Sequence, residues 1–350
     1  MTKLRLLKSV SAATFVAAAL WLFWPFDTTQ IVTQSQPILV TKQDSTKGPI
    51  QYAIVEEKQM VTEIAQIGSN DSALWVAAAF AAELNYPPYS QPLKKADFDR
   101  LNPNHFNPQS IPVDDSGASI SASLTKYRYT YPENIEASLN GENITSAVLN
   151  LVDIDKGKPL KSVSFENING QWQANIRGER DYPPQLQATA IVEVNNKTVS
   201  VALSLKYIDS VASLKSFESA ISRAADMVIE ANLSVREKGM YRVMANLFDN
   251  NDQPIAHLVA RKKLSKGNKS IELKVHQSVL QAKVPPFYLS TFNIELMSPS
   301  PGVAKKFGNS LINKHVINDF SISSLENTPY QPTEKELQRL KLLENMADMN

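Results

Sequence analysis

The sequence predicts a mainly β protein built from two tandem antiparallel β-sandwiches. Apolar side chains occupy every second position in residues 227–235, and residues 241–247 repeat the pattern. A period of two places alternate side chains on opposite faces of a strand, so one face of each strand is expected to be buried. Residues 199–207 alternate in the same way, and turns rich in Asn, Asp or Gly separate the runs at short intervals. Antiparallel sandwiches combine strands and turns in this manner.

Composition restricts the classes of function. The 350 residues are enough for two domains, and 36 basic against 35 acidic residues leave a net charge of +1. Without a strong positive field we expect no nucleic-acid partner. The chain has no cysteine, which excludes disulfides, thiolate nucleophiles, an N-terminal lipidated Cys and Cys-based metal sites.

Residues 1–30 predict a signal-anchor helix. Lys3, Arg5 and Lys8 precede an uncharged stretch over residues 9–26, and positive flanks stay on the cytoplasmic side of a membrane. Eighteen residues lie near the lower limit of roughly 17–25 for a spanning helix. We expect a single-pass inner-membrane protein with most of the chain in the periplasm. A removed signal peptide, which would also export the chain, and a buried soluble helix are the alternatives.

Residues 31–118 are expected to form a tether, a short helix and a proline-rich strap. The alanine-rich stretch 72–84 is too short to cross a bilayer, so we expect it to pack on a β domain. Six prolines between residues 87 and 112 favour extended chain. Apolar anchors that include Tyr86 and Tyr89 favour a strap ordered against a neighbouring domain over a disordered linker.

The first sandwich is predicted over residues 119–210. Tyr127, Tyr129 and Tyr131 form a β-prone run and are candidates for a binding surface. Trp172 is a further candidate, although it alternates in phase with the apolar residues that follow it, which indicates a core position.

The second sandwich is predicted over residues 211–326. Residues 208–222 are mildly helical and are expected to form the connection between the two sandwiches. Residues 327–350 are expected to form a helical tail. Thr333 and Glu336 have the spacing of a capping box. The tail helix places the candidate residues Leu337, Leu340 and Leu343 on one face, which could dock on the body, pair with another chain or fray.

The strand and turn segments of the second half resemble an immunoglobulin-like module of exported bacterial proteins, including domains of unknown function. The segments that carry this resemblance are 241–249, 254–256, 264–267, 271–273 and 287–289. The resemblance covers about 110 residues and, more faintly, the preceding sandwich. It implies an immunoglobulin-like fold and an exported context, and it carries over no active-site residue.

No local motif predicts catalysis, a cofactor or a metal. The four histidines, at positions 105, 257, 276 and 315, have no metal-site spacing. Residues 153–157 begin like a calcium loop but lack its later ligands. No nucleophile elbow or phosphate-binding glycine loop is present.

The sequence therefore favours a non-enzymatic, membrane-anchored bacterial envelope protein that binds another envelope protein as a scaffold or assembly factor. Edge strands, the proline-rich strap and the tail helix are the expected contact surfaces. A glycan- or surface-binding, adhesin-like module is the alternative and would need exposed aromatic residues. A hydrolase, with a site assembled from distant residues, is a third possibility.

Overall fold

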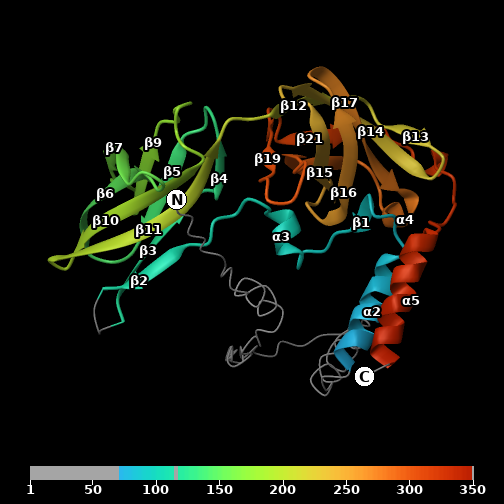
Figure 1. Cartoon of the computed structure of the whole chain (residues 1–350), viewed down its shortest axis with the longest axis horizontal. Helices are drawn as coiled ribbons and strands as arrows, with labels where there is room; N and C mark the ends of the chain where they lie inside the picture. Colours follow the sequence, from blue (N-terminus) through green and yellow to red (C-terminus); the bar gives the residue numbers. More distant parts are fainter. Residues whose placement is uncertain (1–70, 114–116, 349–350) are drawn as a thin grey trace, which may run out of the picture. The chain divides into compact units, whose positions relative to one another are not determined.

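The computed structural model describes residues 71–348 except 114–116 (Figure 1). The predicted anchor at residues 9–26 and the tether at 27–50 lie outside these residues. Within the described part of the chain, no helix combines the length and the apolar character that crossing a membrane requires. The described chain is mainly β, with several antiparallel sheets, so the predicted fold class is confirmed at this level.

Two five-stranded sheets enclose the first hydrophobic core, and we call them the first sheet pair. One sheet has the order β2 (Gln109–Pro112), β3 (Ser119–Leu124), β5 (Ile135–Asn140), β9 (Gln171–Ile176), β8 (Glu166–Ile168). The other has the order β4 (Arg128–Thr130), β11 (Lys197–Ile208), β10 (Gln185–Val194), β6 (Ile144–Asp153), β7 (Lys158–Ser164). The β10–β11 hairpin turns at Asn195 and Asn196, both with positive φ. Asn is the non-glycine residue that best tolerates this conformation, which fixes the register.

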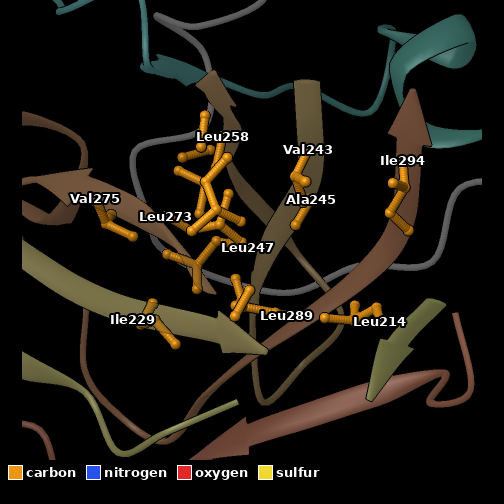
Figure 2. Packing of buried hydrophobic residues seen from close by; sticks show 14 of the residues in the cluster. Leu214, Ile229, Val243, Ala245, Leu247, Leu258, Leu273, Val275, Leu289 and Ile294 are labelled. Atoms are coloured by element: carbon orange, nitrogen blue, oxygen red, sulfur yellow. The ribbon is translucent and has the colours of Figure 1, made fainter. Parts of the chain in front are cut away.

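The second sheet pair encloses the second core (Figure 2). One sheet runs β1 (Ser90–Pro92), β16 (Pro254–Leu264), β15 (Gly239–Asp249), β18 (Phe287–Leu296), with β19 (Lys306–Phe307) and β21 (Lys314–Ile317) both paired to β18. In the other, β14 (Asp226–Val235) pairs with β17 (Gly267–His276), β12 (Ala212–Phe217) and β13 (Ile221–Arg223), and β12 pairs with β20 (Asn309–Ser310). Leu247, Leu273 and Leu289 are fully buried between these sheets. The short elements α4 (Gln277–Leu280) and η1 (Ile322–Ser324) complete this part.

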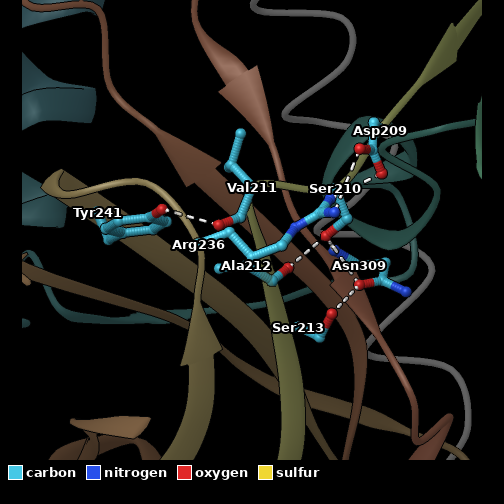
Figure 3. A network of polar contacts seen from close by, with 8 residues as sticks. All are labelled: Asp209, Ser210, Val211, Ala212, Ser213, Arg236, Tyr241 and Asn309. Carbon is cyan, nitrogen blue, oxygen red and sulfur yellow. Dashed lines mark hydrogen bonds and ion pairs between the residues drawn. The ribbon is translucent and has the colours of Figure 1, made fainter. Parts of the chain in front are cut away.

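The connection between the sheet pairs is not helical, so that prediction is wrong. Residues 212–217 form β12, because Ala212 and Leu214 turn into the second core and the backbone pairs with β14 and β20. Polar contacts hold the entry to this strand (Figure 3). Arg236 makes two hydrogen bonds to the Asp209 carboxylate. The Ser210 and Ser213 hydroxyls both donate to Asn309 Oδ1.

Tyr241→Phe is expected to destabilise the second sheet pair by about 1–3 kcal/mol. The buried Tyr241 hydroxyl lies 2.7 Å from the Glu237 carbonyl oxygen and 3.2 Å from that of Val211, and phenylalanine would leave both without this donor. Hydrogen exchange of the β12 and β15 amides measures the loss. Tyr288→Phe, whose hydroxyl donates to Asp252 near the surface, serves as control and should cost less than about 0.5 kcal/mol. Equal effects of the two changes would contradict the prediction.

The proline-rich strap is ordered chain that packs on both sheet pairs. Residues 90–92 pair with β16 as β1, and Tyr86 packs against the second core. Further along, α3 (Phe98–Leu101) precedes Phe106, which packs against the first core. The Asn246 amide donates to the Arg100 carbonyl oxygen at 2.7 Å and so attaches α3 to β15.

Acidification is expected to loosen this attachment. His257 Nδ1 lies 2.7 Å from Asn246 Oδ1, an atom that can only accept. Burial, together with the charges of Arg100 and Arg242, lowers the pKa of His257 from 6.5 to about 4. The neutral form of His257 is therefore favoured in the folded state. Its contribution to the free energy of unfolding is complete above pH 6.5 and is lost as the pH falls from 6.5 towards 4.

Hydrogen exchange of the α3 amides between pH 7 and pH 4 tests this, after correction for intrinsic rates. The free energy of opening at α3 should fall by about 1–2 kcal/mol. This is less than the whole pKa shift of His257 would give, because the ring is partly exposed to solvent. In His257→Gln, which cannot titrate, α3 should lose much less protection on acidification. An unchanged pH profile in that variant would refute the assignment to His257.

Candidate protein-binding surface

Helix α2 (Asp71–Glu83) is apolar around almost its whole circumference. Its only charged residues, Asp71 and Glu83, stand at its two ends, and the interval is filled mainly by alanines and large apolar residues. At its C-terminal end, the Gln91 amide of β1 donates to the carbonyl oxygens of Tyr86 and Pro87, at 3.1 and 3.2 Å. These bonds fix the exit of the helix on the second sheet pair.

Helix α5 (Glu334–Asp348) begins at the predicted capping box. The Thr333 backbone N–H donates to Glu336 Oε2 at 2.7 Å, and the Glu336 N–H donates to Thr333 Oγ1. The Tyr330 hydroxyl also donates to Glu336 Oε2, at 2.9 Å. Burial acts to raise the pKa of Glu336, but the hydrogen bonds from Thr333 and Tyr330 outweigh it, and the pKa is lowered. The carboxylate is therefore ionised at neutral pH and favours the helix start.

The two helices lie side by side and antiparallel (Figure 1). Ala77 on α2 and Leu84 directly after its end are buried and Phe80 is half-buried, at intervals of three and four residues that define one face. On α5, Leu340 and Leu343 are half-buried at helical spacing. The main neighbour of α2 among the described elements is thus α5, and the expectation that this helix packs on a β domain is wrong.

The rest of α2 leaves apolar side chains in contact with solvent in the described structure. Leu74, Trp75 and Val76 are 53%, 54% and 52% exposed. Ala78, Ala79 and Ala82 are exposed beside them. A two-helix pair covers only one face of each helix, and the second face is normally polar. On α5 the exposed surface mixes charged side chains with Leu337, Leu342 and Met346, whereas between the ends of α2 it carries no charge. We call this surface of Leu74–Val76 and the three alanines the α2 face.

The candidate residues from the sequence do not form one surface. Leu337 is 50% exposed on α5, whereas Leu340 and Leu343 are half-buried. Tyr86 and Tyr89 are half-buried strap anchors, and the Tyr89 hydroxyl donates to Asp226 at 2.8 Å. The signal for the α2 face was the lack of charge in residues 72–82, but the sequence did not show which side of the helix would stay uncovered.

The aromatic candidates of the first sheet pair are also separated. Tyr129 is fully buried in the first core, so it cannot meet a surface ligand. Tyr127 is 39% exposed. Tyr131 and Trp172 are half-buried and pack against the first core. For Trp172 this is the position that the alternation of residues along the sequence indicated.

The first sheet pair carries a groove of about 790 Å³ that is lined by both polar and apolar residues. Cross-strand neighbours on β5 and β9 contribute to it, with Glu136 opposite Asn175 and Ser138 opposite Gln173. None of the four aromatic candidates lines it. Among the described residues, no group of three or more His, Asp or Glu side chains could hold a metal ion.

Comparisons with known proteins assign no family. No family model matches the chain, and no curated protein matches it. Among solved structures, a DUF4785 family protein of Legionella pneumophila shares 14% identity at a TM-score of 0.39, over 51% of this chain and 52% of its own. Salmonella alpha-2-macroglobulin reacted with methylamine shares 12% at a TM-score of 0.29, over 61% of this chain and 15% of its own. The chain thus spans about half of the Legionella protein. Similarities this weak carry no argument about function.

Proposed function

We propose that this chain is a non-enzymatic bacterial envelope protein that binds another envelope protein through the α2 face. In this proposal residues 9–26 anchor it in the inner membrane, and two immunoglobulin-like sandwiches lie in the periplasm. The observation that carries the proposal is the exposure of three consecutive large apolar side chains, Leu74–Val76, on a helix with no charge between its ends. Contiguous exposed apolar surface is typical of interaction sites.

The chemistry of the α2 face points to an amphipathic helix of the partner as its occupant. Ala78, Ala79 and Ala82 let a second backbone approach closely, while Trp75 offers a large anchor beside them. Because residues 72–82 contain no charge, a matching helix needs an apolar stripe and not a charged one. Such a helix would lie along α2 on the side away from α5.

Photo-crosslinking of the full-length protein in cells tests this proposal. A benzophenone amino acid at Ala78 should give a discrete adduct with a different protein, and the crosslinked peptide should map to an amphipathic helix in it. The adduct should disappear when Trp75→Asp is added. The same amino acid at Lys158, an exposed position on β7, should not give it.

Three outcomes would refute the proposal. An adduct of twice the chain mass would assign the α2 face to a second copy. A crosslink to residues 1–70 of the same chain would assign it to the protein's own N-terminal part. An adduct that persists unchanged in the Trp75→Asp variant would show that the α2 face does not select the partner.

The groove of the first sheet pair favours glycan binding as a second candidate function. Its carboxylate, hydroxyl and amide groups, from Glu136, Ser138, Gln173 and Asn175, are suited to sugar hydroxyls. Retention on peptidoglycan or immobilised polysaccharide, lost in a Gln173→Ala/Asn175→Ala variant but kept in Trp75→Asp, would support it. Retention that the double variant does not reduce would count against this groove.

A further inference from the structure

An apolar groove of about 530 Å³ lies at one end of the sheet that contains β15, β16 and β18. Met240, Leu296, Met297 and Val303 form its apolar floor, and Met240 and Val303 are 45% and 49% exposed. Gly239 shapes this floor, because a Cβ atom there would overlap with Leu296 Cδ1. Two methionines make the floor adaptable, since their unbranched side chains adjust to different occupants.

The rim of the groove is positively charged. Lys238 precedes β15, Lys263 lies on β16 and Lys306 on β19. Glu237 is the single acidic residue that lines the groove, and its carboxylate pairs with Lys306 at 2.7 Å. Among the described residues, Lys238 and Lys263 have no acidic partner within salt-bridge distance, so the groove holds an excess of two positive charges over an apolar floor.

We propose that this groove binds an acidic segment of a partner protein, with apolar side chains on the floor and carboxylates at the lysine rim. The three ammonium groups come from the turn before β15, from β16 and from β19, so their charge matches several carboxylates along a peptide better than one lipid headgroup. The half-exposed floor is too open to shield a long acyl chain from water. This site is separate from the α2 face and does not depend on its function.

A fluorescein-labelled heptapeptide, Glu-Glu-Leu-Phe-Leu-Glu-Glu, serves as the probe in fluorescence anisotropy with the full-length protein in detergent. It should bind, and its affinity should fall as salt rises. Lys238→Glu/Lys263→Glu should weaken binding at least tenfold. Ala304→Trp, which fills the groove from an exposed lining position, should weaken it without changing the charge.

Matched controls separate this site from general electrostatic attraction. Lys158→Glu/Lys197→Glu makes the same charge change at exposed lysines of the first sheet pair and should leave binding unchanged. The counterpart peptide with lysines for glutamates should not bind. Equal losses in the two double variants, or an Ala304→Trp variant that binds normally, would overturn the proposal. Binding of hexadecanoate or anionic vesicles in place of the peptide would also overturn it, and would assign the groove to a lipid.

Discussion

Trp75→Asp is expected to weaken partner binding about a hundredfold and to leave the fold intact. Tryptophan anchors at interfaces contribute about 2–4 kcal/mol, and a carboxylate placed against an apolar helix adds a desolvation cost. Because Trp75 is 54% exposed in the described structure, its removal should change the free energy of unfolding by less than about 1 kcal/mol. The yield of the Ala78 photo-adduct in cells measures binding, and circular dichroism melting of the purified protein measures stability.

Two variants define the specificity of this effect. Trp75→Phe keeps an aromatic anchor and should retain most of the adduct. Ile154→Asp introduces the same charge at another exposed apolar residue, 43% exposed in the first sheet pair, and should retain all of it. If Ile154→Asp lowered the yield as much as Trp75→Asp, the effect would reflect a general loss of apolar surface. A large loss of stability in Trp75→Asp would show that Trp75 belongs to a core.

The sequence predicted those strands whose period-two pattern is complete. In β11 and β14 one face is buried along most of the strand, so the pattern is visible without knowledge of neighbours. In β12 only Ala212 and Leu214 are buried, and the strand exists because β14 and β20 pair with it. Pairing with residues about 20 and 95 positions away leaves no local pattern, so a helical connection was predicted instead.

The candidate sites depend even more on distant residues. The capping box at Thr333 is a local motif, and the sequence located the start of α5 correctly. The antiparallel pairing of α2 with α5, in contrast, joins segments from opposite ends of the described chain, and no spacing in either helix specifies it. The lysine-rimmed groove draws its residues from β15, β16, β18 and β19, from the turn before β15 and from the loop after β18. Its composition becomes apparent only once the strand order is known.

Glu295→Gln is expected to destabilise the second sheet pair by about 3 kcal/mol at pH 7. Only 4% of the Glu295 side chain is exposed, and its carboxylate pairs with Arg242 on the neighbouring strand β15 and with Lys305 Nζ at 2.8 Å. A neutral amide would leave two cations without their partner, and Arg242 is itself only 28% exposed. Hydrogen exchange of the β15 and β18 amides, which lie on either side of the pair, measures this loss locally. Glu272→Gln breaks the exposed pair with Arg223 and should cost less than about 0.5 kcal/mol.

The same pair gives the stability of this sheet a defined pH dependence. Burial acts to raise the pKa of Glu295, but hydrogen bonds from Lys305 and Arg242 outweigh it, so the pKa lies below its ordinary value of 4.5. A carboxylate with a lowered folded-state pKa stabilises the fold above its unfolded-state pKa, and this contribution disappears as the pH falls through the folded-state value. The difference between the wild type and Glu295→Gln should therefore be constant from pH 7 to about 5 and shrink below that. A difference that persists undiminished after the pH has fallen through the folded-state pKa of Glu295, when both forms are uncharged at this position, would show that the cost comes from packing and not from the ion pair.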